Sequence, residues 1–117
     1  HGLSYTTFEY SNLSVSSDSI SKNGSLTINI DVKNSGGRSG KEAVELYVSD
    51  LFGSVTRPNK QLKGFDKISL EPGETKSVSF NLNADDLAFY DRDMNRVIEA
   101  GEFKVFVGGL EKSFNVN

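Results

Sequence analysis

The chain has 117 residues, a formal net charge of −3 and a pI near 5.1, and it contains one histidine and no cysteine. An acidic chain lacks the basic face that nucleic acids and anionic membranes require, so neither is expected as a partner. No apolar run approaches the roughly 20 residues of a membrane helix, and without cysteine there are no disulfides or thiolate metal sites. We expect one domain over residues 1–117 with a single core. Nothing in the composition indicates a localisation.

Hydrophobic and polar residues alternate in much of the chain, and a period of two predicts strands with one buried and one solvated face. The clearest strands are expected at residues 26–32, 44–48, 78–82 and 103–107. Weaker strands are expected at residues 8–15, 62–70 and 112–116. About seven strands separated by regular turns predict an all-β fold, an immunoglobulin-like sandwich of two sheets.

Two segments depart from simple alternation. In the first strand Phe8 and Tyr10 are out of phase with Leu13 and Val15, which predicts a bulge or a switch of sheet. The one helical candidate is residues 84–90, with the preceding asparagine as its N-cap and two aspartates in its first turn.

A positively charged tract interrupts the β pattern. Residues 57–65 read RPNKQLKGF and follow a strand pattern at residues 42–50, and a turn at 70–75 comes next. A sandwich gains little from a cationic segment that is broken by proline. Together with GLSYT at residues 2–6, the order of these segments resembles the fibronectin type III-like domain that ends many glycoside hydrolase family 3 enzymes, a family that contains β-glucosidases.

The resemblance implies a fibronectin type III-like, non-catalytic C-terminal domain that packs on and stabilises the catalytic domains of the same polypeptide. In such enzymes the nucleophilic aspartate and the acid/base glutamate belong to upstream domains. The parent protein is then expected to be a retaining β-glycosidase, whereas this chain alone is not an enzyme. Residues 1–7 are expected to be a linker remnant from the preceding catalytic domain, and His1 a cut or processed end.

The residue types themselves also argue against catalysis by this chain. The single histidine stands at position 1, so no Ser-His or Cys-His arrangement can be built. Glycosidases need two carboxylates roughly 5–9 Å apart in a pocket, and most of the 16 acidic residues fall in turns or at outward strand positions. We expect no catalytic, cofactor-binding or metal-binding residue in this chain.

Five residues are candidates for contacts with a neighbouring domain. Tyr47 and Phe106 are expected to point outward from adjacent strands and to share one surface patch. Arg57, Pro58 and Lys60 are expected in a long loop that projects beyond the sandwich, where the arginine can bond to a partner's carboxylates or carbonyls. The alternative is an independent carbohydrate-binding module that uses the aromatic patch. We favour the interdomain contact because the chain has no tryptophan and an exposed apolar cluster usually marks an interface.

Residues 91–102, DRDMNRVIEAGE, match a calcium-binding EF-hand loop at its first, third, fifth and twelfth positions. The sixth position is Arg96, where that loop needs glycine for a sharp turn. The residues that follow are predicted to form a strand and not the exiting helix. A polar hairpin turn, with Val97 and Ile98 in the returning strand, is therefore the preferred interpretation, and a calcium-stabilised adhesion or spacer domain is a weaker alternative.

Overall fold

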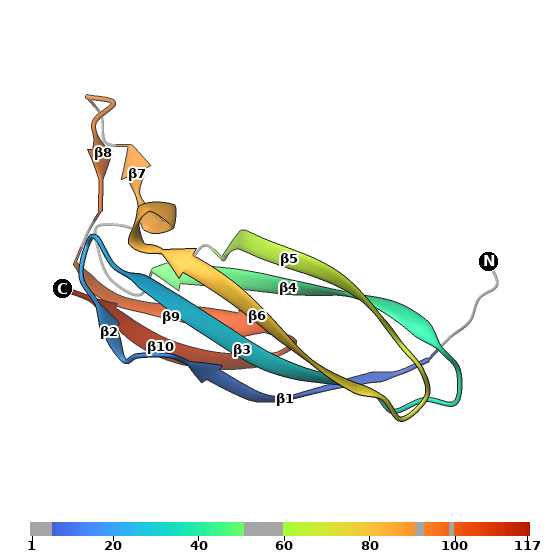
Figure 1. Cartoon of the computed structure of the whole chain (residues 1–117). Coiled ribbons are helices and arrows are strands. Elements are labelled where there is room, and N and C mark those ends of the chain that lie inside the picture. Colours follow the sequence, from blue (N-terminus) through green and yellow to red (C-terminus); the bar gives the residue numbers. More distant parts are fainter. Residues whose placement is uncertain (1–5, 51–59, 91–92, 99) are drawn as a thin grey trace.

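Two β-sheets face each other in the computed structural model, which describes residues 6–50, 60–90, 93–98 and 100–117 (Figure 1). The three-stranded sheet has the order β1 (Phe8–Val15), β3 (Ser25–Asn34), β6 (Thr75–Asn83). The five-stranded sheet has the order β2 (Ser19–Ile20), β10 (Leu110–Val116), β9 (Gly101–Val107), β4 (Gly40–Asp50), β5 (Gln61–Leu70). The all-β sandwich that the alternation predicts is confirmed. It contains one strand more than expected, because β2 is only two residues long and leaves no periodic signal.

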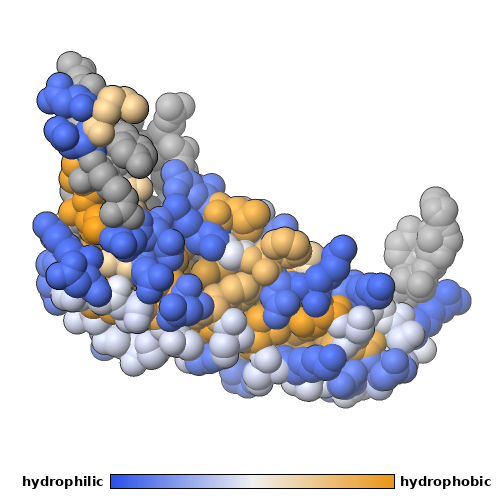
Figure 2. All heavy atoms as spheres, turned by 45° about the horizontal axis from the view of Figure 1, so that its top comes forward, coloured by the Kyte–Doolittle hydropathy of each residue, from blue (hydrophilic) through white to orange (hydrophobic). Residues whose placement is uncertain are grey.

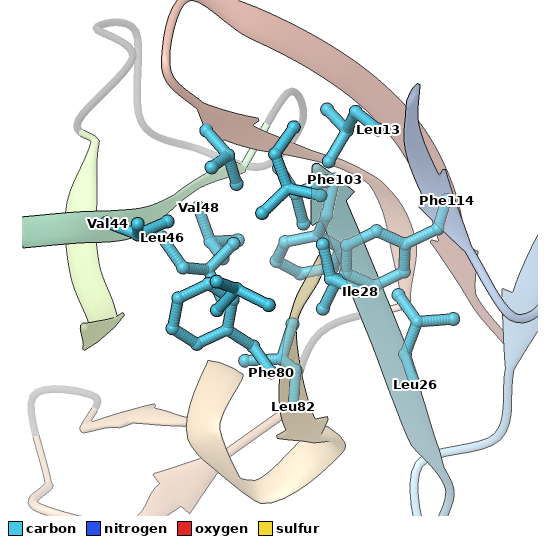
Figure 3. Close-up of a cluster of buried hydrophobic side chains, with 14 of the residues drawn as sticks. Leu13, Leu26, Ile28, Val44, Leu46, Val48, Phe80, Leu82, Phe103 and Phe114 are labelled. Atoms are coloured by element: carbon cyan, nitrogen blue, oxygen red, sulfur yellow. The ribbon is translucent and has the colours of Figure 1, made fainter. Parts of the chain in front are cut away.

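The hydrophobic core fills the space between the sheets. Its centre consists of alternate residues from two facing strands, Leu26, Ile28, Ile30 and Val32 of β3 and Val44, Leu46 and Val48 of β4. Figure 3 shows Leu26 and Ile28 of β3 and the three β4 residues together with Phe80 and Leu82 of β6. Nearby, Phe103 and Phe114 stack with their ring centroids 5.7 Å apart. Each such buried side chain contributes roughly 1.5–3 kcal/mol through the loss of apolar surface from water.

β1 contains the predicted bulge and does not switch sheets. Its pairing with β3 shifts between residues 11 and 14, where Asn12 has a left-handed backbone with a φ of 56°. Asparagine adopts this conformation more readily than most residues, and the Asn12 side-chain amide donates a hydrogen bond to the Asp31 carboxylate at 2.8 Å. The bulge lets both Tyr10 and Leu13 pack against the core, which explains their different phases in the sequence.

The predicted helix at residues 84–90 is wrong in its length. Only η1 (Ala84–Leu87), a single 3-10 turn, is helical. The Asn83 backbone N–H donates to the Asp86 carboxylate at 2.8 Å and caps this turn. One turn is enough to bury the first and last residues of η1, so no longer helix is needed. In the described part of the chain η1 is the sole helix, and four residues cannot cross a membrane.

A hairpin follows η1 and projects from one end of the sandwich (Figure 1). β7 (Phe89–Tyr90) pairs antiparallel with β8 (Arg96–Val97), so the predicted hairpin is confirmed at the place where an EF-hand would form its loop. Val97 lies in the returning strand as predicted, whereas Ile98 follows its end. Aromatic residues favour strands, which accounts for the early end of the helix. Asp91 lies outside the described residues. Among those described, no group of three or more His, Cys, Asp or Glu side chains could hold a metal ion.

One buried polar side chain, that of Asn34, ties together the other end of the sandwich. Its Oδ1 accepts hydrogen bonds from the Thr6 hydroxyl at 2.6 Å and from the Gly36 N–H at 3.0 Å. Its Nδ2 donates to the carbonyl oxygens of Arg38 at 2.6 Å and of Leu70 at 3.1 Å. The side chain is 0% exposed, and these four bonds use its full hydrogen-bonding capacity.

A second polar link joins the two sheets at one edge. The Tyr10 hydroxyl of β1 donates to the Glu42 carboxylate of β4 at 2.5 Å. Burial, and then this hydrogen bond, raise the pKa of the Tyr10 hydroxyl well above its ordinary value, so the hydroxyl remains a donor at neutral pH. The Tyr10 ring lies against Gly108 in the turn between β9 and β10, where an added Cβ would come within 2.3 Å of the ring.

We expect Asn34→Leu to lower the free energy of unfolding by about 2–3 kcal/mol or more, because each buried polar group left without a partner costs about 1–3 kcal/mol. Asn115→Leu, at an exposed position of β10, is the matched control and should change stability by no more than about 0.5 kcal/mol. Urea unfolding of both variants measures the difference. Equal losses of unfolding free energy in the two variants would mean that water replaces the hydrogen bonds of the Asn34 side chain.

Gly108 and Gly109 allow the contact with Tyr10 to be separated from backbone strain. Both have positive φ, 58° and 88°, but an added Cβ meets the Tyr10 ring only at Gly108 and meets nothing within 4 Å at Gly109. We expect Gly108→Ala to destabilise the chain by about 1–3 kcal/mol more than Gly109→Ala, as overpacking of this kind typically does. Thermal and urea unfolding test this, and a difference near zero would contradict the contact.

Candidate functional site

Four side chains form a row across the outer face of the five-stranded sheet. Tyr47 of β4 pairs with Leu62 of β5 on one side and with Phe106 of β9 on the other, and Phe106 pairs with Glu111 of β10. Residues paired directly in antiparallel strands project from the same face. We call Leu62, Tyr47, Phe106 and Glu111 the outer row. The prediction that Tyr47 and Phe106 are neighbours on one sheet face is confirmed.

The outer row depends on a bulge in β5. The pairing with β4 skips Lys63, so Leu62 and Gly64 pair with consecutive residues of β4. Without this extra residue Leu62 and Gly64, two positions apart, would share the inner face. Gly64 does face inward, where an added Cβ would lie 3.1 Å from the Phe80 ring. The bulge therefore lets the chain place a glycine under Phe80 and a leucine on the surface.

The outer face keeps large apolar side chains in water. Leu62 is 51% exposed and Phe65 is 60% exposed. Phe65 pairs with Glu45, beside the outer row, and Tyr47 and Phe106 are half-buried. Figure 2 shows hydrophobic side chains reaching the surface along the middle of the molecule, between hydrophilic ones. A contiguous apolar group of this kind is typical of a contact surface.

Lys60 lies over the outer row. Its ammonium nitrogen is 4.2 Å from the centroid of the Phe106 ring, a cation–π contact. This position corrects the prediction that Lys60 projects beyond the sandwich in a loop. The reason is that the residue directly precedes β5, whose first residues pair with β4 next to β9. Arg57 and Pro58 lie outside the described residues, so their assignment to an interdomain contact stays a prediction.

Tyr47 carries a polar group at the edge of the aromatic surface. Its hydroxyl donates to the Glu45 carboxylate at 3.1 Å. This hydrogen bond, more than any burial, raises the pKa of the Tyr47 hydroxyl. The ring is thus oriented by a neighbour two positions away in the same strand, with its apolar body on the sheet and its donor toward solvent.

A hollow of about 550 Å³ lies beside the outer row, where the β9–β10 hairpin ends. Its lining combines the rings of Tyr10, Tyr47 and Phe106 with the carboxylates of Glu42 and Glu45. The carboxylates of the hollow are already engaged, since Glu42 accepts from Tyr10, Glu45 accepts from Tyr47, and the third, Glu111, pairs with Lys104 at 3.0 Å. The arrangement offers aromatic surface and negative charge to a ligand or partner.

Sequence reasoning found part of this surface and missed the rest. It identified Tyr47, Lys60 and Phe106, which the structure brings together. It missed Leu62 and Phe65, which are three positions apart and share one face only because of the bulge. The available signal was the spacing itself, since a leucine and a phenylalanine at odd separation cannot both be buried in a regular strand.

The chain is similar to one part of several larger glycosidases. Thermostable beta-glucosidase B of Acetivibrio thermocellus is 47% identical over 124 residues, covering 100% of this chain and 16% of that protein. The periplasmic beta-glucosidase of Salmonella typhimurium and a putative beta-xylosidase of Formosa agariphila are each 44% identical over 108 residues, covering 92% of this chain. The chain spans only 14–16% of the length of these relatives.

Solved structures give the same picture. The chain superimposes on part of the β-glucosidase EmGH1 from Erythrobacter marinus with a TM-score of 0.90 and 35% identity, covering 100% of this chain and 16% of that one. The β-glucosidase from Listeria innocua gives a TM-score of 0.84 at 33% identity, with 99% and 17% covered. The profile described as fibronectin type III-like domain matches residues 42–111, which include β5 and the outer row. The chain therefore belongs to the fibronectin type III-like domain family.

Proposed function

We propose that the chain is a non-catalytic accessory domain of a glycoside hydrolase family 3, β-glucosidase-like enzyme, and that it packs on and stabilises the catalytic domains of the same polypeptide. The observation that carries this proposal is the outer face of the five-stranded sheet, where Leu62 and Phe65 are more than half exposed beside Tyr47 and Phe106. The match to about a sixth of several β-glucosidases supplies the context.

The two outer faces of the sandwich differ in polarity, and this difference indicates which sheet packs against the catalytic domains. On the three-stranded sheet, the outward residues are polar and bond to one another, as in the Ser77 hydroxyl that donates to Asp31 at 2.6 Å and the Ser79 hydroxyl that donates to Asn29. On the five-stranded sheet the outward residues include large aromatic and aliphatic side chains, Tyr47, Leu62, Phe65 and Phe106, among charged ones. A face that is meant for water gains nothing from large apolar side chains. The five-stranded sheet is therefore the side that we assign to the catalytic domains.

A second candidate function is carbohydrate binding by the domain itself. The observation that favours it is the hollow, which places aromatic rings beside carboxylates. Sugars stack on open aromatic faces. The Lys60 ammonium lies over the face of Phe106 that such stacking would use, at 4.2 Å, so we rank this function second. Relatives include β-glucosidases and β-xylosidases, and the proposal accordingly covers β-glycosidases as a class and not one sugar.

The test uses the longer enzyme that contains this chain, together with the 117-residue chain. We expect Phe65→Ser and Tyr47→Ala to leave the melting temperature of the chain alone nearly unchanged and to lower that of the longer enzyme. A ring removed from a buried interface typically costs more than about 1–2 kcal/mol. The same behaviour is expected for Arg57→Ala. Calorimetry of both proteins measures these effects.

Met94→Ser is the matched control, because Met94 is 74% exposed on the β7–β8 hairpin and lies away from the outer row. It should leave the melting temperature of both proteins unchanged. Large losses in the chain alone for Phe65→Ser or Tyr47→Ala would mean that these side chains hold the domain itself together. Binding of cellobiose to the chain alone, lost in Tyr47→Ala, would favour the second candidate.

A further inference from the structure

β4 continues beyond the end of the strand beside it. β9 pairs with β4 only at residues 46–50, whereas β5 pairs with β4 along residues 40–48. Figure 1 shows the β9–β10 hairpin ending part-way along the sandwich while β4 and β5 run on. Over residues 40–45, one edge of β4 therefore has no strand partner among the described residues.

The hollow lies beside this free edge. Its lining includes Glu42 and Glu45 of β4, and Gly108 and Gly109 of the turn in which β9 ends. The Tyr10 ring, packed against Gly108, belongs to the other sheet and forms the floor. Successive residues of a strand direct their N–H and C=O groups to opposite edges, so part of the backbone of residues 40–45 faces the hollow. Unpaired groups along a strand edge are a template for an added strand.

The charged side chains that line the hollow indicate which kind of added strand could bind there. Three glutamates line it, Glu42, Glu45 and Glu111, against one lysine, Lys60. Glu111 is already paired with a lysine of β9 at 3.0 Å, and Lys60 is held over an aromatic ring. Glu42 and Glu45 each accept a hydrogen bond from a tyrosine hydroxyl, and no lysine or arginine of the described residues pairs with either one. Glu42 shares the inner face of β4 with Val44, whereas Glu45 shares the outer face with Tyr47. A cationic side chain on either face of an added strand would therefore meet one carboxylate.

We propose that an extended segment of the catalytic part of the same enzyme, bearing arginine or lysine, adds as a strand to the edge of β4 at residues 42–45, in line with β9. This inference rests on the proposed function and adds the chemistry of the partner. The backbone groups of β4 provide the hydrogen bonds, Glu45 faces the cation on the outer face, and the rings of Tyr47 and Phe106 cover its apolar stem. The Tyr10–Glu42 bond holds one carboxylate in place before the segment arrives.

A second copy of this chain fits the hollow less well. Two copies that met edge to edge at β4 would set Glu42 and Glu45 of one against the same residues of the other, and like charges directly opposite each other are destabilising. The net charge of −3 on each copy adds to this repulsion.

Amide hydrogen exchange of β4 tests the inference. We expect the edge-facing amides among residues 42–45 to exchange about tenfold or more slowly in the longer enzyme than in the 117-residue chain, because an added strand gives them partners. Residues 35–39, in the loop before β4, should exchange equally in both. In the longer enzyme, Glu45→Lys should return the exchange of residues 42–45 toward the rate of the chain alone. Glu9→Lys makes the same charge change at an exposed site of β1 and should leave the slow rate intact.

Each other outcome has one meaning. Protection of Leu62 and Phe65 without protection of residues 42–45 would overturn the strand addition and leave the proposed packing standing. No protection in either region would overturn both. Slow exchange in the chain alone that disappears on dilution would identify a second copy as the occupant. Slow exchange induced in the chain alone by cellobiose, used as the sugar probe, would identify a saccharide, and both of these results would overturn the inference.

Discussion

The bulge at Lys63 is the constraint on which the outer surface depends. A regular β5 would place both Leu62 and Gly64 toward the core, and at position 64 an added Cβ would lie only 3.1 Å from the Phe80 ring. One skipped residue resolves the conflict, since Gly64 stays under Phe80 and Leu62 joins Tyr47 on the outside. The same local irregularity thus serves the core and creates the exposed apolar face. Any change that straightened β5 would affect both.

The sandwich presents two different outer faces to its surroundings. The three-stranded sheet closes its surface with hydrogen bonds between short polar side chains, among them the Ser77–Asp31 pair. The five-stranded sheet leaves rings and a leucine uncovered beside a hollow that carries net negative charge. This asymmetry distinguishes the face that suits a neighbouring domain from the face that suits water. A domain that acted only as a spacer would gain nothing from it, whereas a domain that packs against a neighbour needs one face of each kind.

Most of the fold could be predicted from the sequence because a period of two is a local property. The alternation in β3 and β4 predicts both strands and their buried faces, and residues 26–32 are confirmed in full. The end of the helix at Leu87 was harder to predict, since the capping residues at its start do not specify where it stops and the only signal is the strand preference of the two aromatic residues that follow. The contacts of the candidate functional site were harder to predict from the sequence than the strands. The hydrogen bond from Tyr10 to Glu42 and the cation–π contact of Lys60 with the Phe106 ring each join residues more than 30 positions apart. Only the topology of the sheets brings these residues together.

The Asn34 side chain has a mechanical consequence for the end of the domain where the described chain begins. Its bond from Thr6, together with the Thr7 carbonyl that accepts the Ser35 N–H at 2.9 Å, anchors the entering backbone to the β3–β4 loop and to the end of β5. The described chain therefore enters the domain at a mechanically fixed point, where Thr6 and Thr7 are held to the ends of β3 and β5. A force applied at Thr6 would load these strand ends through the hydrogen bonds of Asn34.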